Sequence, residues 1–209
     1  MKRMIMLGAL IAVGGRDLRI RPDTGGLETQ SGQTQYGRCQ DDWGNWFGGN
    51  NSLPMWHYVI DEHYARRNKN LRTGRLWRDI CDPPGAAAVY PASRTLERFN
   101  DFDKVNRFTS ACSPSVYRDH LLGKQYYSNV FVCEPVHDLV FRGVMKQDGY
   151  SFRVTRAPEQ SQTEFFAADD NWSRPVMART GPDGAVWIAD MYRFAIEHPE
   201  WIPIRWRRK

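Results

Sequence analysis

Short alternations of apolar and polar residues run through much of the chain and predict β-strands joined by tight turns. In the C-terminal third, an alternating segment is followed by the turn Gly181–Gly184 and then by a second, mostly apolar segment, Ala185–Met191. This pattern is typical of a β-hairpin. Because Val186, Trp187 and Ile188 are apolar in succession, we expect this strand to be buried on both faces, between sheets above and below it.

The same pattern occurs twice more upstream, in Asn45–Asn50 and in Asn129–Glu134. Each copy follows a strand-like segment and a turn, and each copy ends in Asn, Glu or Asp. Recurrent units of about 40–50 residues made of short strands indicate a β-propeller. The predicted fold is therefore all-β, with antiparallel, short-stranded blades. Three unrelated hairpins of a β-sandwich are the alternative.

A propeller ring usually closes with about four to eight blades. Three copies therefore predict an incomplete ring, whose open edges need the missing blades or a partner chain. We expect a partial propeller domain over residues 14–203, with a long insertion at about 61–107 and a basic tail at 204–209. Segments Asp17–Arg21 and Leu27–Gln30 predict a further hairpin, and Leu53–Ile60 predicts a third strand. The insertion is read as a lid, a binding loop or a disordered segment.

Residues 1–13 have two interpretations. Lys2 and Arg3 precede an apolar run, as in a secretory signal, although no clear cleavage site follows and the run is too short to span a bilayer. Alternatively, the segment is a strand that continues into the next hairpin.

Composition and charge narrow the class of protein. Hydrophobic residues make up 41% of the chain and aromatic residues 13%, which excludes disorder. The formal net charge is +5, but the basic residues are scattered among acids and concentrated otherwise only in the tail. No helix-in-groove or stacking motif accompanies them, so nucleic acid is not expected as a partner.

Four cysteines are present, without the Cys-x-x-Cys-His motif of covalent haem. Cys112 and Cys133 lie on the two strands of one predicted hairpin, and antiparallel pairing would bring them within a residue or two of each other. A disulfide there would indicate an oxidising compartment. Two buried free thiols are the alternative.

Several motifs together resemble one bacterial family. They are Arg16–Gly25, Gly37–Cys39 with Asp42–Asn45, Thr109–Cys112, Phe131–His137, Arg174–Val176 with Gly181–Gly184, Asp190–Tyr192 and Ile196–Pro203. The chain from about Gly14 resembles the membrane-bound dehydrogenase-type domain of planctomycete and verrucomicrobial bacteria. That family is similar to the soluble glucose and sorbosone dehydrogenases, β-propellers that use pyrroloquinoline quinone.

The resemblance implies a periplasmic or extracellular, in some cases membrane-associated, sugar or alcohol dehydrogenase with a c-type cytochrome as electron acceptor. The His-Gly-rich segment that carries the catalytic base in the quinone glucose dehydrogenases has no match here.

Such chemistry needs a base, a cation beside the quinone and usually Ca²⁺. The predicted bases are His137 and His57, and the predicted cation is Arg174. Two further cations are assigned to cofactor binding, Arg38 and Arg193. Asn50, Glu134 and Asp190 end equivalent strands of the three copies, so a ring would point them toward a common end, where their oxygens could hold Ca²⁺.

Each of these residues also has a structural interpretation. Polar residues at strand ends often satisfy backbone groups, and His137 could hydrogen-bond within its own loop. His198, which precedes a proline, is read as a residue that locks the closing segment. The core is predicted to contain Trp172, Trp187 and Trp201.

Two other classes of function remain open. A non-catalytic propeller module could bind glycan or protein through aromatic residues near its loops. A Ca²⁺-dependent lactonase-like hydrolase would use the same oxygen ligands with a metal-bound water.

Overall fold

The computed structural model describes residues 3–6, 9–70, 72–93 and 106–195 of the chain. Strands make up most of the regular structure, in antiparallel sheets that do not close into a ring within these ranges. The all-β fold predicted from the sequence is confirmed. Within the described residues, the helical elements are α1 (Glu62–Ala65) and two 3-10 helices, η2 (Lys124–Tyr126) and η3 (Pro158–Gln160). Among the described residues, no helix has the length and apolar character needed to cross a membrane.

The first large sheet is a four-stranded antiparallel meander, β5-β6-β7-β8. Its strands are β5 (Cys39–Gln40), β6 (Trp46–Asn50), β7 (Leu53–Tyr58) and β8 (Trp77–Asp79). Two hairpins precede it: β1 (Arg3–Met6) with β2 (Ala9–Ala12), and β3 (Asp17–Arg21) with β4 (Gly26–Gln30). The hairpins predicted at Asp17–Gln30 and around Asn45–Asn50 are confirmed.

The second large sheet is built on another meander, β10-β11-β12-β13, to which β9 adds in parallel and β14 adds beside β12. The bounds are β9 (Cys81–Asp82), β10 (Cys112–Val116), β11 (Val130–Glu134), β12 (Leu139–Asp148), β13 (Ser151–Arg156) and β14 (Phe166–Ala167). The last hairpin joins β15 (Pro175–Thr180) to β16 (Val186–Asp190). Gly184 has a φ of 82° in its turn, a conformation that favours glycine.

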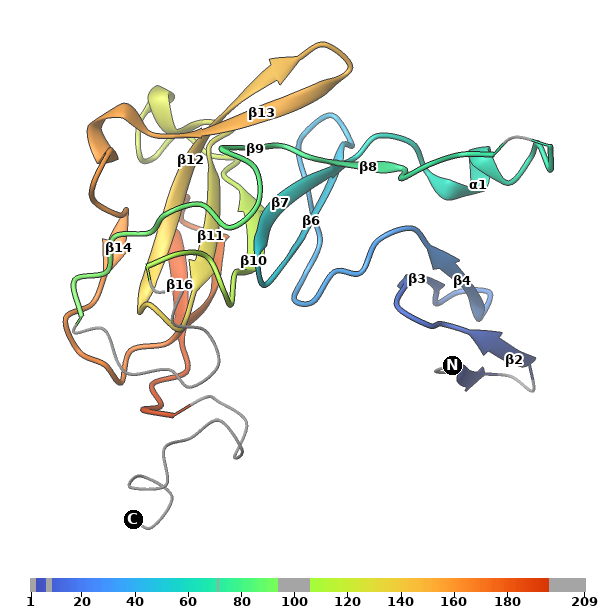
Figure 1. Ribbon diagram of the computed structural model, residues 1–209, viewed down its shortest axis with the longest axis horizontal. Coiled ribbons are helices and arrows are strands. Elements are labelled where there is room, and N and C mark those ends of the chain that lie inside the picture. Colours follow the sequence, from blue (N-terminus) through green and yellow to red (C-terminus); the bar gives the residue numbers. More distant parts are fainter. Residues whose placement is uncertain (1–2, 7–8, 71, 94–105, 196–209) are drawn as a thin grey trace.

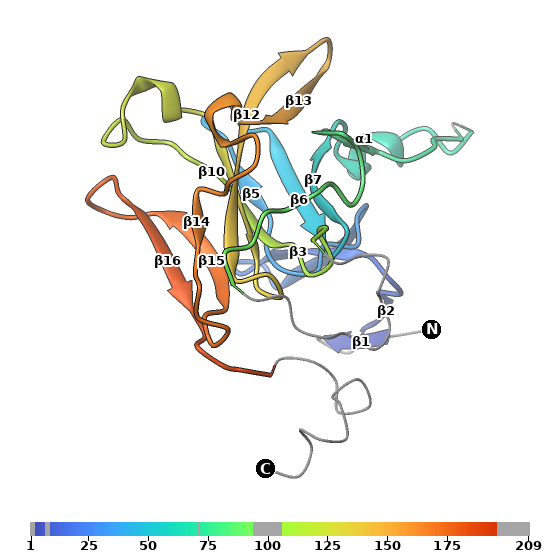
Figure 2. The same ribbon diagram turned by 60° about the vertical axis from the view of Figure 1, so that its left-hand side comes forward.

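The two large sheets and the last hairpin pack against one another as layers. Strand β10 contacts β6 on one side and β15 on the other, and β15 also contacts β11. Figure 2 shows β15 and β16, in orange to red, on one side of β10, and β6 and β7, in light blue to teal, on the other. The sheet that contains β11 is therefore the middle layer of the stack.

Strand β11 carries the core on both of its faces. Val130 and Val132 belong to one apolar cluster, together with Phe47 of β6. Phe131 and Cys133 belong to a second cluster, with Ala178 of β15. A strand in a middle layer has to be apolar on both faces, which explains its continuous apolar sequence.

The prediction that β16 is buried on both faces was wrong. Trp187 is 59% exposed, and Val186 and Ile188 are only partly buried against the second cluster. The reason is that β16 lies in the last layer of the stack, so that only its inner face is covered. Trp172 is 50% exposed and is not a core residue either, and Trp201 lies outside the described residues.

The predicted register of the two cysteines is confirmed, but the disulfide is not formed. Cys112 and Cys133 are direct partners across β10 and β11. Both are free thiols, as are Cys39 and Cys81. The Cys112 Sγ atom points toward β15, where it donates to the carbonyl of Val176 at 3.5 Å. The structure therefore agrees with the alternative of two free thiols.

The insertion at 61–107 is more regular than a loop. Its first half contains helix α1 and the strands β8 and β9. The two strands add to the edges of the large sheets, and Ile80 between them is part of the first apolar cluster. Residues 94–105 of the insertion lie outside the described residues. At the N-terminus the strand interpretation of residues 1–13 agrees with β1 and β2, while the signal interpretation stays a prediction.

Candidate functional site

The predicted ligand Glu134 ends β11 inside the protein, with none of its surface exposed. Its carboxylate accepts hydrogen bonds from the backbone N–H of Thr109 (3.2 Å) and of Ser110 (3.0 Å), and from the Ser110 hydroxyl (2.5 Å). These donors hold the segment before β10 against the end of β11. The contacts are those of a buried carboxylate that satisfies backbone groups.

His137, a predicted base, lies beside Glu134 and is 5% exposed. Its Nε2 atom accepts a hydrogen bond from the backbone N–H of Asn106 at 3.1 Å, so the ring hydrogen resides on Nδ1. That hydrogen is donated to Glu134 Oε1 at 3.2 Å. Both ring nitrogens are therefore engaged within the protein.

The predicted cation Arg174 is also buried, at 3% exposed. Its guanidinium donates to Asp138, to the carbonyl of Pro135 (3.0 Å) and to the carbonyls of Arg193 (3.0 Å) and Phe194 (2.7 Å). Burial raises the pKa of Asp138, against the effect of hydrogen bonds and the Arg174 charge. Arg174 thus ties the β11–β12 loop to the segment after β16.

Like Glu134, the other two predicted calcium ligands accept hydrogen bonds from the protein. Asp190 accepts hydrogen bonds from Ser173 and from the backbone N–H of Arg174 and Tyr192. Asn50 accepts one from the backbone N–H of Leu53 at 3.2 Å, within the β6–β7 turn. The described residues contain no group of three His, Cys, Asp or Glu side chains that could hold a metal ion.

His57, the other predicted base, lies on β7 beside the first apolar cluster and is 4% exposed. Its ring packs against Phe47 and Phe152, with centroids 5.4 and 5.0 Å away, and Nδ1 lies 3.0 Å from the Ser151 hydroxyl. Burial lowers the pKa of His57 below its ordinary value. The ring is neutral and forms part of the core.

The two predicted cofactor cations lie on different elements. The guanidinium of Arg38, just before β5, stacks 3.7 Å from the ring centre of Tyr58 and lies 3.7 Å from Asp17. Arg193 follows β16 and has an exposed side chain.

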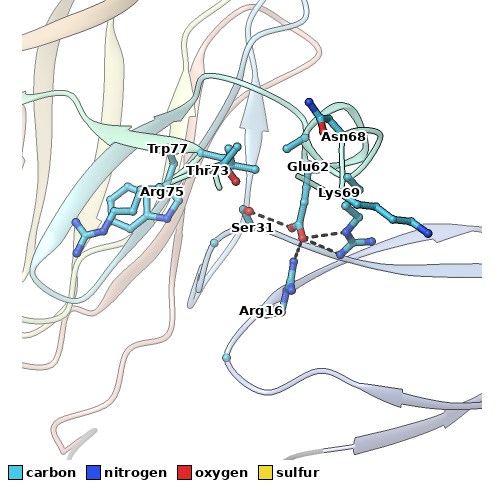
Figure 3. Close-up of a pocket in the computed structure, with 14 residues that line it drawn as sticks. Arg16, Ser31, Glu62, Asn68, Lys69, Thr73, Arg75 and Trp77 are labelled. Atoms are coloured by element: carbon cyan, nitrogen blue, oxygen red, sulfur yellow. Dashed lines mark hydrogen bonds and ion pairs between the residues drawn. The ribbon is translucent and has the colours of Figure 1, made fainter. Parts of the chain in front are cut away.

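A solvent-accessible site lies between the β3–β4 hairpin, α1 and the segment that leads into β8. It is a cavity of about 700 Å³. Figure 3 shows Glu62 near its centre, with Trp77 and Arg75 on one side and Lys69 on the other. The cavity is lined by Gly15, Arg16, Ser31, Gly32, Glu62, Ala65, Arg66, Asn68, Lys69, Thr73, Gly74, Arg75, Leu76 and Trp77.

Glu62 holds the walls of this cavity together. It accepts hydrogen bonds from Arg16, from Ser31 (3.0 Å) and from Arg66 (2.8 Å), and so joins α1 to both ends of the β3–β4 hairpin. Partial burial opposes ionisation of Glu62, but the bonds from Arg16, Arg66 and Ser31 outweigh it and hold its pKa below the ordinary value. The carboxylate is therefore ionised, and it neutralises part of the charge of the two arginines.

Lys69 and Arg75 give the cavity its remaining positive charge. Neither has a carboxylate partner within the part of the chain that the structure describes. The Arg75 guanidinium lies 4.7 Å from the ring centre of Trp77, and Trp77 stacks on Trp56 with centroids 4.7 Å apart. The lining therefore combines a rigid aromatic wall with accessible cations.

Sequence reasoning missed this site. The signal that could have found it is the density of basic residues in the insertion, where Arg66, Arg67, Lys69, Arg72 and Arg75 occur within ten positions. The polar residues of this segment predict a loop. Nothing in the local pattern indicates that α1 returns to the β3–β4 hairpin.

The fold and the site define an all-β protein of stacked antiparallel sheets with a cationic cavity beside them. A family model with the description "Domain of unknown function (DUF7133)" matches residues 6–209. The chain belongs to this family. No curated protein and no solved structure matches the chain.

Proposed function

We propose that the chain is a non-catalytic binding module, and that the cavity around Glu62 binds an acidic glycan. One contrast carries this proposal. The predicted bases His57 and His137 are 4% and 5% exposed and hydrogen-bonded inside the protein, whereas the cations of the cavity face an open space of about 700 Å³. A base has to reach the hydrogen that it abstracts, and neither of these two histidines lines the cavity around Glu62.

The proposed architecture is part of a β-propeller. Two meanders of four strands each, β5-β6-β7-β8 and β10-β11-β12-β13, lie next to each other, and the β15–β16 hairpin continues the series. Blades of four short antiparallel strands are the unit of a propeller. In this interpretation the chain holds two complete blades, and the β15–β16 hairpin is half of a blade.

The charges of the lining favour an anionic ligand. Four cations line the cavity, Arg16, Arg66, Lys69 and Arg75, against the single carboxylate of Glu62. Hydroxyl and amide groups of Ser31, Thr73 and Asn68 add donors and acceptors for sugar hydroxyls. Sites for small ligands commonly combine an apolar wall with a few well-placed polar groups, and Trp77 supplies that wall.

Quinone and calcium chemistry, which the family resemblance implies, does not fit these residues. The oxygens of Glu134 and Asp190 already accept hydrogen bonds from the protein, and Arg174 is saturated by Asp138 and backbone carbonyls. The proposal therefore includes no dehydrogenase or metal-dependent hydrolase step. The periplasmic or extracellular location stays a prediction and agrees with a glycan ligand.

The test is calorimetric titration of the full chain with trigalacturonic acid and, in parallel, with neutral maltotriose. We expect saturable binding of the acidic sugar only. Lys69→Ala and Arg75→Ala should each weaken it about ten-fold, because each removes a charged hydrogen-bond donor. The matched control is Lys146→Ala, an exposed lysine of β12 outside the cavity. Equal binding of both sugars, or affinity unchanged in the cavity variants, would contradict the proposal.

A further inference from the structure

Beyond glycan binding, the last hairpin has the features of a self-association edge. Its outer strand, β16, is exposed or only partly buried at every position, whereas β15 packs onto β10 and β11. Residues 186–189 carry neither a charge nor a proline, and the charge of the strand lies at its last position, Asp190. Proteins usually protect exposed strand edges with charged residues, prolines or bulges, because an open edge is a template for another strand.

The direction of the free backbone groups follows from the hairpin register. The Gly181 N–H donates to the Ala185 carbonyl at 2.8 Å, and Arg179 is the next hydrogen-bonded partner position, opposite Trp187. Because hydrogen-bonded and non-hydrogen-bonded pairs alternate in an antiparallel ladder, Val186 and Ile188 point their N–H and C=O groups away from β15. These groups face the edge of β16 that pairs with no other strand among the described residues.

We propose that β16 pairs antiparallel with β16 of a second copy of this chain, about a two-fold axis at Ile188. This register places Ile188 opposite Ile188 of the second copy as a hydrogen-bonded pair and Val186 opposite Asp190. Trp187 then lies opposite Ala189, a large side chain beside a small one. The contact is isologous, as expected for a closed dimer.

The size of the resulting sheet favours a second copy as the occupant. Isolated two-stranded sheets are marginally stable in water. Pairing of two β16 strands gives one continuous four-stranded sheet, β15-β16-β16-β15, which is the strand number of the two meanders in the same chain. Each copy's body lies under its own β15, since β10 and β11 contact β15, and so lies away from the shared edge.

The exposed face of the new sheet provides the sharpest test, because Trp187 and Ala189 are both exposed and can be changed without altering the core. In the double variant Trp187→Lys/Ala189→Lys, like charges stand opposite each other twice in the dimer. In Trp187→Lys/Ala189→Glu, Lys and Glu face each other at both of these positions and attract. Charges directly opposite across strands attract or repel measurably.

Sedimentation equilibrium of the full chain over a hundred-fold concentration range measures the effect. We expect a monomer–dimer equilibrium, a dissociation constant raised roughly ten-fold or more in the Lys/Lys variant, and restored dimerisation in the Lys/Glu variant. A wild-type chain that is monomeric throughout, or a Lys/Lys variant that dimerises like the wild type, would overturn the proposal.

A second variant tests the backbone contact. Ile188→Pro removes an N–H that does not bond to β15, so the hairpin should persist and the dimer should be lost. Ile188→Val, which keeps the N–H, is the control and should dimerise normally. Near-ultraviolet circular dichroism confirms the fold of both. Dimers in the folded Pro variant would show that association occurs elsewhere and would also contradict the proposal.

Discussion

His137 donates its Nδ1 hydrogen to Glu134 Oε1 across 3.2 Å, and both side chains are at most 5% exposed. The pair lies where β10, β11 and the β11–β12 loop meet. Its other hydrogen bonds go to the backbone of Asn106, Thr109 and Ser110 and to the Ser110 hydroxyl. Residues that the sequence places at a catalytic centre thus hold three chain segments together.

Glu134→Gln should destabilise the protein by about 2–4 kcal/mol, because the amide NH₂ would face backbone N–H groups that now bond to a carboxylate. Urea unfolding followed by circular dichroism measures the change. Glu28→Gln changes a partly exposed carboxylate 3.6 Å from Arg21. It is the control and should alter stability by less than about 0.5 kcal/mol. Equal effects of the two substitutions would be incompatible with the buried network.

Arg174→Met should cost about 3–5 kcal/mol, since it leaves Asp138 buried without its guanidinium partner. The same unfolding experiment applies. Arg153→Met removes a mostly exposed guanidinium 3.5 Å from Asp82 and should have a small effect. If Arg174→Met were as mild as Arg153→Met, the role of Arg174 in joining the two loops would be wrong.

The hairpins could be predicted from the sequence because their turn residues and alternating strands are local signals. The Gly181–Gly184 turn and the Cys112–Cys133 register are examples. The layer in which a strand lies is not local. Strands β11 and β16 have similar apolar sequences, but only β11 has a sheet on each side. The cavity could not be predicted for the same reason, because its walls are joined by a contact between Glu62 and Arg16, which are 46 positions apart in the sequence.

Acid should reduce stability through His57. Its pKa in the folded protein is lowered from 6.5, so below about pH 6.5 the unfolded chain binds a proton that the folded chain does not. The contribution is present at neutral pH and is lost as the pH falls, at about 1.4 kcal/mol per pH unit at most. His57→Gln removes this dependence. Parallel curves of unfolding free energy against pH for the two proteins would contradict it.

The four cysteines should be unreactive in the native protein. Burial raises the pKa of Cys39 and of Cys112 to about 12 and raises those of Cys81 and Cys133 as well, so that little thiolate exists at pH 8. With Ellman's reagent we expect slow labelling of the native chain and four thiols per chain in denaturant. Two thiols in denaturant would reveal a disulfide.

The central claim is that ligands bind at the cavity around Glu62 and not at the buried network around Glu134. Titration of isotope-labelled chain with trigalacturonic acid, followed by heteronuclear NMR, tests it most directly. We predict saturable shifts of the Gly32 and Gly74 amides and of the Trp77 indole, which line the cavity, with the amides of Ser110 and His137 unchanged. Shifts centred on Ser110 and His137, or no shifts at all in the folded chain, would contradict the account.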